Sequence, residues 1–116
     1  MRISVIIPTF NRSEKLVLVL EALNKQSLLP HEYEVLVVDN NSKDNTKDVV
    51  ESCVKKYSRL NIKYFFERQQ GLNFARNCGV QQAHSNIVAF LDDDAIPQTD
   101  WLHTILRTYK DHTVGC

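Results

Sequence analysis

Three consecutive aspartates, Asp92, Asp93 and Asp94, are the residues whose type and spacing most directly suggest chemistry. Adjacent carboxylates repel one another, so a fold gains nothing from clustering them without a cationic partner. A hard divalent cation such as Mg²⁺ or Mn²⁺ prefers oxygen ligands and is the natural partner. On an extended backbone Asp92 and Asp94 point to one side and Asp93 points to the other. One side can therefore meet a metal ion while the other meets a sugar hydroxyl.

The coordination preference of the ion predicts the kind of ligand. Mg²⁺ usually takes only one or two protein carboxylates and completes its shell with substrate phosphates, so the triplet predicts a phosphate-bearing ligand. The alternative, equally compatible with the triplet alone, is a solvated acidic turn that caps the next helix.

Other polar side chains follow apolar runs in the same way. Asp39 closes a buried run, and its carboxylate can accept a hydrogen bond from a ribose hydroxyl or a base N–H. Its alternative role is helix capping within the Asp39–Ser42 loop, and Thr9 can likewise be only a turn hydroxyl. Arg76 falls near the start of a predicted helix, where the helix dipole favours anions, so it is expected to reach a phosphate or a carboxylate. An ordinary surface ion pair is the alternative for Arg76.

Four apolar runs are predicted to be strands that position these residues. Near-continuous apolar runs indicate burial on both faces, which is typical of parallel strands. The third run carries Lys63 and is less uniform, so it is placed nearer an edge. The runs are Ile3–Ile7, Val35–Val38, Ile62–Phe66 and Ile87–Leu91.

Helical patterns separate these strands. Asn11 with Glu14 three residues later resembles a capping box, and the helix that follows should end near Ser27. The other three helices are expected to start at Ser42 or Asp44, around Gly71, and near Asp100. The inward faces are expected to be Leu16, Leu20 and Leu23; then Val49, Val50, Cys53 and Tyr57; then a row of small residues, Ala75, Gly79 and Ala83; and finally Leu102, Ile105, Leu106 and Tyr109.

The alternation of strands and helices predicts an open, doubly wound α/β domain with a mainly parallel sheet and helices on both faces. In such sheets ligands bind outside the carboxyl ends of the strands, which is where the polar residues above converge. The last residues, Thr113–Cys116, have the pattern of the start of a further element.

Composition excludes several classes of protein. The 116 residues suffice for one domain, and the formal net charge of zero gives no indication of nucleic acid binding. The three cysteines are widely spaced without a CxxC pair, which argues against a disulfide framework and a zinc site. The N-terminus lacks the pattern of a signal peptide, which favours a cytoplasmic location, with peripheral membrane association left open.

Four segments together resemble family 2 glycosyltransferases in order and spacing, and they cover nearly the whole chain. The segment with Asp92–Asp94 resembles the family's metal-binding DxD region. The segments are Ile3–Arg12, Val37–Thr46, Gly71–Gly79, and Phe90–Asp94 followed by Pro97 and Trp101–Leu102.

The resemblance implies a GT-A fold and an inverting transfer of a sugar from a nucleotide-diphospho-sugar donor, most simply a UDP-sugar. It implies that Asp39 binds the base and that the Pro8–Thr9 turn lies beside the nucleotide. It assigns the divalent cation, Mn²⁺ or Mg²⁺, to Asp92 and Asp94. The donor-binding residues that it implies are Pro8, Thr9, Asn11, Asp39, Asn41, Arg76, Asp92 and Asp93.

One departure concerns catalysis. The family's catalytic base is an acidic residue on a later segment, where a saccharide or lipid-linked acceptor also binds, and Asp111 at the far end of a helix cannot replace it. The sequence therefore predicts a donor-binding domain over residues 1–116 that stops before the acceptor half, with the base beyond Cys116. A missing half would leave apolar surface uncovered, which favours self-association into a homo-oligomer.

Three alternatives remain beside an enzyme domain. A non-catalytic module that holds a nucleotide-sugar, or an inactive fragment, differs by the absence of donor hydrolysis or transfer. A sugar nucleotidyltransferase needs a glycine-rich loop after the first strand, and Thr9–Ser13 contains no glycine. A receiver-like signalling domain needs an acid at the end of the first strand, which is also absent here.

Overall fold

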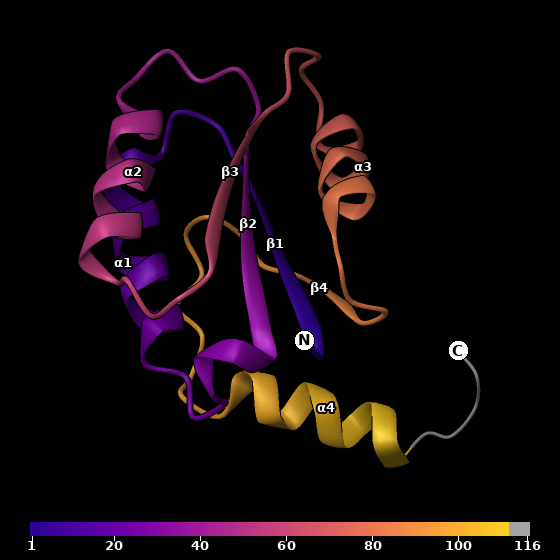
Figure 1. Cartoon of the computed structure of the whole chain (residues 1–116). Coiled ribbons are helices and arrows are strands. Elements are labelled where there is room, and N and C mark those ends of the chain that lie inside the picture. The colour runs from indigo at the N-terminus through magenta and orange to yellow at the C-terminus, as the bar shows by residue number, and fades with distance from the viewer. Residues whose placement is uncertain (112–116) are drawn as a thin grey trace.

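The computed structural model describes residues 1–111, which form a four-stranded parallel sheet with helices on both faces (Figure 1). Neighbouring strands follow the order β3-β2-β1-β4 across the sheet. The strands are β1 (Ile3–Thr9), β2 (Tyr33–Asp39), β3 (Ile62–Phe66) and β4 (Val88–Phe90). The predicted fold class, with a parallel sheet covered on both sides, is confirmed.

The helices divide between the two faces. Helices α1 (Ser13–Asn24) and α2 (Thr46–Lys56) cover one face and α3 (Leu72–Gln82) covers the other (Figure 1). A short 3₁₀ turn, η1 (Pro30–Glu32), precedes β2, and α4 (Trp101–Asp111) lies across the end of the sheet at which β1 begins. The larger core cluster lies under α1, α2 and α4, and the smaller one lies under α3.

Burial along the strands explains why their apolar runs were recognisable in the sequence. Every residue of β2 is buried, because β2 pairs with β1 on one side and β3 on the other. β3 lies at the edge of the sheet, as Lys63 suggested, and its burial decreases toward Phe66. The β3 bounds match the prediction, whereas β1 and β2 extend further, to Thr9 and Asp39, and β4 is shorter than predicted.

The row of small residues on α3 brings the helix close to the sheet. A Cβ atom added to Gly79 would lie 2.5 Å from Cγ2 of Ile6, so only glycine fits the present spacing. Ala75 and Gly79 are buried against the sheet as predicted. Ala83 follows the last helical residue in an extended conformation and continues the contact from outside the helix.

Two predicted helix starts are wrong. The proposed capping box fails because Asn11 has a positive φ of 52° and its amide oxygen accepts a hydrogen bond from the Lys43 backbone N–H, 2.7 Å away. Helix α1 begins at Ser13 without a side-chain cap, and it ends at Asn24, before the predicted Ser27. Helix α2 begins at Thr46, after both of the predicted starting residues.

The predicted inward face of α4 is correct only in part. Leu102 and Leu106 are buried and Ile105 packs against the core, but Tyr109 is 46% exposed. Tyr109 lies in the last turn of a helix that passes the end of the sheet, so the core no longer reaches it (Figure 1). The predicted further element at Thr113–Cys116 lies outside the described residues.

Candidate donor-binding site

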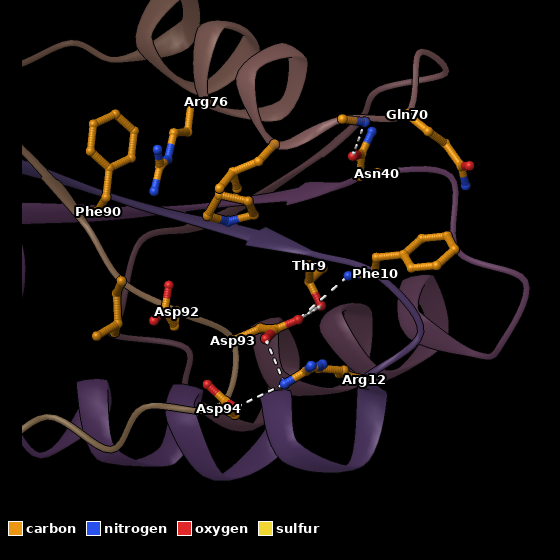
Figure 2. Close-up of a pocket in the computed structure, with 14 residues that line it drawn as sticks. Thr9, Phe10, Arg12, Asn40, Gln70, Arg76, Phe90, Asp92, Asp93 and Asp94 are labelled. Carbon is orange, nitrogen blue, oxygen red and sulfur yellow. Dashed lines mark hydrogen bonds and ion pairs between the residues drawn. The ribbon is translucent and has the colours of Figure 1, made fainter.

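A cleft of about 530 Å³ opens at the carboxyl ends of β1 and β4 and at the start of α3 (Figure 2). This is the place that parallel α/β topology predicts for a ligand, because the loops that follow the strands converge there. The cleft is lined by Pro8, Thr9, Phe10, Arg12, Asn40, Gln70, Gly71, Leu72, Arg76, Phe90, Leu91, Asp92, Asp93 and Asp94.

Asp93 is fixed by the end of β1. Thr9 donates its hydroxyl to a carboxylate oxygen of Asp93 over 3.0 Å, and the backbone N–H of Phe10 approaches the same oxygen at 3.4 Å. The Asp93 side chain is therefore only 13% exposed. The alternative interpretation, that Thr9 is only a turn hydroxyl, is incomplete. Thr9 also links the end of β1 to the turn that follows β4.

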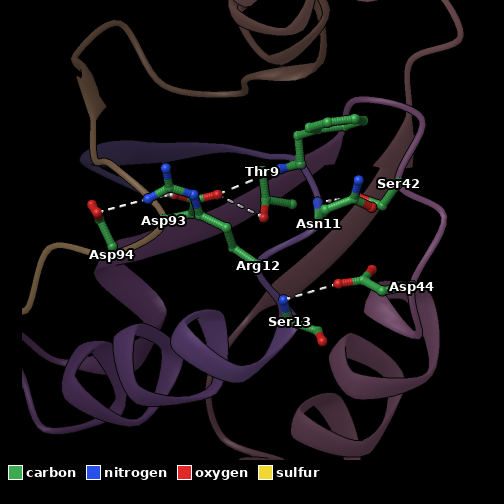
Figure 3. Close-up of polar contacts among 9 residues, drawn as sticks. Thr9, Asn11, Arg12, Ser13, Ser42, Asp44, Asp93 and Asp94 are labelled. Atoms are coloured by element: carbon green, nitrogen blue, oxygen red, sulfur yellow. Dashed lines mark hydrogen bonds and ion pairs between the residues drawn. The ribbon is translucent and has the colours of Figure 1, made fainter.

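Arg12 connects the two aspartates that the sequence placed on opposite sides. Its guanidinium lies 2.8 Å from Asp94 and 3.8 Å from Asp93 (Figure 3). The expected alternation of side chains fails because β4 ends at Phe90, and Asp93 and Asp94 occupy a turn. Both carboxylates therefore face the same guanidinium, that of Arg12 at the start of α1.

Asp92 differs from its two neighbours. It is exposed and lines the cleft, and among residues 1–109, whose side chains are described, its carboxylate has no hydrogen bond or ion pair. Its carbonyl oxygen accepts from the N–H of Ala95 over 3.2 Å, which closes the turn that carries the other two aspartates. The Asp92 carboxylate is thus available to a ligand.

Asn40 shapes the opposite wall of the cleft. Its side-chain amide donates to the carbonyl oxygens of Glu67 and Gln69, at 3.3 and 2.7 Å, and its oxygen accepts from the Gly71 N–H at 3.0 Å. These contacts hold the β3–α3 loop against the end of β2, so the first turn of α3 faces the cleft (Figure 2). The sequence analysis missed Asn40, although the Asp39–Ser42 run drew attention to its neighbours.

Arg76 projects from α3 toward the cleft and stacks on a ring from β4. Its guanidinium carbon lies 5.3 Å from the centre of the Phe90 ring, within the range of a cation–π contact. Arg76 is exposed, and no acidic side chain among residues 1–109, whose side chains are described, pairs with it. The alternative of an ordinary surface ion pair is therefore not what the described residues contain.

Three residues that the resemblance implied as donor contacts do not line the cleft: Asn11, Asp39 and Asn41. Asp39 is buried, and its two oxygens accept from the Ser42 N–H at 2.9 Å and from the Tyr64 hydroxyl at 2.6 Å. Burial, together with the Asp39 carboxylate, raises the pKa of Tyr64 well above its ordinary value. The alternative role of Asp39, helix capping, is not observed: Asp39 closes the loop to Ser42, whereas α2 begins later, at Thr46.

The loops after β1 and β2 are locked to each other below the cleft (Figure 3). The Asn11 N–H donates to the Ser42 hydroxyl over 2.9 Å, and Asp44 accepts from the Ser13 N–H at 3.3 Å and from Thr46. Burial alone would raise the pKa of Asp44, but the hydrogen bonds from Thr46 and Ser13 hold that pKa below its ordinary value. Asn11 therefore supports the Thr9–Arg12 turn from behind.

The donor set of the cleft suits a hard cation. Within the described part of the chain, no three His, Cys, Asp or Glu side chains are close enough together to form a closed metal site. Asp92 and Asp94 provide carboxylate oxygens at the cleft and leave the remaining positions to other oxygen ligands. That arrangement fits an ion such as Mg²⁺, which keeps few protein ligands and shares the rest with a phosphate.

The remaining lining residues were not anticipated as site residues. They are Phe10, Arg12, Asn40, Gln70, Gly71, Leu72, Phe90 and Leu91. Several of them lie inside the four segments that resemble the family. Those segments therefore indicated where the site lies, although the types of these single residues did not.

The sequence pattern of Glycosyl transferase family 2 matches residues 4–116, and the chain belongs to that family. A curated relative, glycosyltransferase AglE of Haloferax volcanii, is 42% identical over 106 residues, which cover 91% of this chain and 34% of AglE. The chain thus spans about a third of the length of this relative.

Two solved structures show the same fold. The mannosyltransferase PcManGT from Pyrobaculum calidifontis, in complex with GDP-Man and Mn²⁺, superposes with a TM-score of 0.92 at 30% identity, covering 98% of this chain and 34% of that one. S. aureus TarS 1–349 in complex with UDP gives a TM-score of 0.85 at 34% identity, covering 97% of this chain and 33% of that fragment. Both confirm the predicted GT-A fold.

Within residues 1–111, no helix combines the length and apolar character that crossing a membrane requires.

Proposed function

We propose that this chain forms the donor-binding part of a glycosyltransferase, which holds a nucleotide-diphospho-sugar with the help of a divalent cation. The observation that carries the proposal is the convergence, in one cleft, of two partly accessible carboxylates, Asp92 and Asp94, with Arg76 and the start of α3. Acidic and cationic groups that face the same space suit a ligand that brings both a metal ion and phosphates.

The diphosphate is assigned to the α3 side of the cleft. The first N–H groups of a helix lack intrahelical acceptors, and the helix dipole favours an anion there. Gly71 and Leu72 bring this end of α3 to the cleft, and Arg76 adds a cation one turn further on. The Asn40 contacts keep these donors in place before the ligand arrives.

The cation is assigned to Asp92 and Asp94. Bound there, it would act as a Lewis acid for the departing nucleoside diphosphate, whose charge increases as the sugar leaves. Asp93 is assigned to the ribose, because Thr9 and Phe10 already hold its carboxylate in a fixed orientation beside the cleft.

The base is assigned to the β1 side, between Pro8–Thr9 and the exposed ring of Phe10 (Figure 2). The TarS and PcManGT structures were determined with UDP and with GDP-Man, so both uracil and guanine are candidates, and only the family resemblance favours uracil. Asp39 and Asn11 would act from behind the lining, through the loops that they hold, and Asn41, whose oxygen accepts from Lys43 Nζ at 3.4 Å, is assigned no donor contact.

Family membership alone supports two further parts of the proposal, inversion at the transferred sugar and a saccharide or lipid-linked acceptor. Among residues 1–111, the acids of the cleft are Asp92, Asp93 and Asp94, all of which are assigned above. The described residues therefore receive no general base, and residues 1–116 are proposed to be a donor-binding domain of a larger transferase.

Calorimetric titration with UDP and GDP, each with and without Mn²⁺, tests the proposal. We expect UDP binding that requires Mn²⁺ and weakens by at least about tenfold in Asp94→Ala, a loss of ~1.4 kcal/mol. Glu51→Gln, which removes one exposed negative charge on α2, is the matched control and should bind like the original chain. A folded chain that binds neither nucleotide, or binds them equally without Mn²⁺ and in Asp94→Ala, would contradict the proposal.

A second candidate, a module that binds the donor without turnover, is favoured by one observation: no acid of the described cleft is left to serve as a base. Release of UDP from a UDP-sugar, with or without added saccharide, separates the two. Metal-dependent binding with no release would support the module.

A further inference from the structure

The position of Arg12 is not explained by the helix that it precedes. Arg12 is the N-cap residue of α1, yet its side chain makes no capping hydrogen bond. A cation at a helix N-terminus is disfavoured by the helix dipole, since anions are stabilised there. Its favourable contacts are instead the carboxylates of Asp94 at 2.8 Å and Asp93 at 3.8 Å, which belong to a loop 82 and 81 residues later in the chain.

The two carboxylates hold Arg12 in different ways. Asp93 is 13% exposed and also accepts from Thr9 and the Phe10 N–H, so it stays in place without the arginine. Asp94 is 42% exposed, and among the described residues Arg12 is its one ion-pair partner. An exposed pair of this kind contributes only about 0–1 kcal/mol, so it can be exchanged for another partner at small cost.

We propose that Arg12 is a displaceable counter-ion that occupies the Asp94 carboxylate until the divalent cation arrives together with the donor. This inference rests on the proposed function, which assigns the cation to Asp92 and Asp94. On binding, the guanidinium leaves Asp94 and remains beside Asp93, while the Asp94 oxygens turn to the cation. Arg12 thereby offsets one of the three negative charges of the acidic turn until the ligand binds.

The counter-ion couples metal binding to donor binding. Without a donor, the Arg12 charge competes with the incoming cation and repels it, so the metal binds weakly. The diphosphate of the donor adds negative charge next to both cations and removes much of this penalty. Arg12 therefore disfavours occupation of the site by a metal ion alone and favours the metal–donor pair.

The magnitude follows from Coulomb's law. A unit charge at ~6 Å from a divalent ion, at the bulk-water dielectric constant of ~80 that suits an exposed pair, changes metal affinity by about tenfold. Removing the Arg12 charge should therefore tighten Mn²⁺ binding in the absence of nucleotide by about tenfold. The tightening should fall to within about threefold when UDP is present.

Titration of the chain with Mn²⁺, followed by the loss of the free-ion electron paramagnetic resonance signal, measures this directly. Arg12→Gln removes the charge, and Arg12→Lys keeps it. Lys25→Gln is the matched control, because it removes an exposed cation at the other end of α1 that likewise pairs with an acid, Glu21, at 3.2 Å. We expect tenfold tighter Mn²⁺ binding in Arg12→Gln alone, with Arg12→Lys and Lys25→Gln within about twofold of the original chain.

The outcomes separate this inference from the proposed function. If the original chain binds Mn²⁺ with UDP through Asp94, but Arg12→Gln binds Mn²⁺ equally or more weakly, the counter-ion role is wrong and the donor site stands. If no variant binds Mn²⁺ even with UDP, the metal site itself fails and the inference falls with it. Should Arg12→Gln lose its helical circular dichroism, Arg12→Lys still decides, because a tenfold change there would refute a role based on charge.

Discussion

Substitution of Gly79 by alanine sets two opposing effects against each other. Alanine is favoured over glycine inside a helix by about 1 kcal/mol, so a surface position would become more stable. At Gly79, however, the new Cβ would lie 2.5 Å from Cγ2, 3.0 Å from Cδ1 and 3.1 Å from Cγ1 of Ile6. The predicted outcome depends on whether Ile6 or the helix can move.

Ile6 has little freedom to move away. It is fully buried in β1, which pairs with β2 on one side and β4 on the other, and its Cγ2 is attached directly to the stiff branch point. Overpacking of a tight core contact costs about 1–3 kcal/mol. The steric cost exceeds the gain in helix propensity, and we expect Gly79→Ala to lower the free energy of unfolding by about 1 kcal/mol.

Chemical denaturation of both proteins measures this difference, and a fall in Tm of about 5 °C should accompany it. Asn77→Ala is the matched control: Asn77 is exposed on the same helix, so only propensity acts there and stability should rise by about 0.5 kcal/mol. A Gly79→Ala protein as stable as the original, or more stable, would show that α3 can shift freely, and would refute the account of its close approach to the sheet.

Two further predictions concern side chains that hold loops. Asn40→Asp replaces the amide that donates to the Glu67 and Gln69 carbonyls by a carboxylate, which cannot donate. We expect the free energy of unfolding to fall by about 2 kcal/mol or more in a denaturation experiment, and UDP binding to weaken in calorimetry. The control, Asn41→Asp, should change stability little. Burial of Glu34 raises its pKa, but hydrogen bonds from Ser4 and His84 outweigh this and leave the pKa below the ordinary 4.5. The stabilising contribution of the Glu34 carboxylate is therefore present above about pH 4.5 and is lost as pH falls through the lowered pKa. In Glu34→Gln, the free energy of unfolding should fall less steeply with decreasing pH in the acid range. An unchanged fall would contradict this role of Glu34.

The strands and the fold class were predictable because their signals are local. The bounds of β3 were predicted correctly, since its apolar run and the break at its end coincide with the paired residues. β4 is shorter than its apolar run because only Val88–Phe90 pair in register with β1, while Ile87 and Leu91 each make one backbone hydrogen bond to it. Tertiary pairing, which no local pattern carries, set that boundary.

The helix starts failed for a related reason. Asn11 has the residue type and spacing of a capping residue, but its left-handed backbone and its bond to the Lys43 N–H, 32 residues later, assign it to the loop. Local spacing shows that a polar side chain could cap; it does not show that a distant backbone group competes for the same oxygen.

The candidate site was predictable at the level of strand ends and less so at the level of single residues. Pro8, Thr9, Arg76 and the aspartate triplet lie at the cleft as the sequence suggested. Arg12 and Asn40 were missed because their roles arise from contacts with loops far away in the chain. The order of the strands brings those loops together, and the sequence indicates that order only through the fold.

The polar residues near the cleft differ in how firmly other protein groups hold them, and this difference decides which of them a ligand can bind. Asp39 is buried and has two partners, Ser42 and Tyr64, so a base that took its oxygens would have to loosen the loop after β2. Asp94 has one exposed partner, and Asp92 has none among residues 1–111, so a cation can engage them without breaking the core. Metal binding at the triplet therefore requires little rearrangement, whereas Asp39 contributes best by keeping its loop, and with it Asn40, in position.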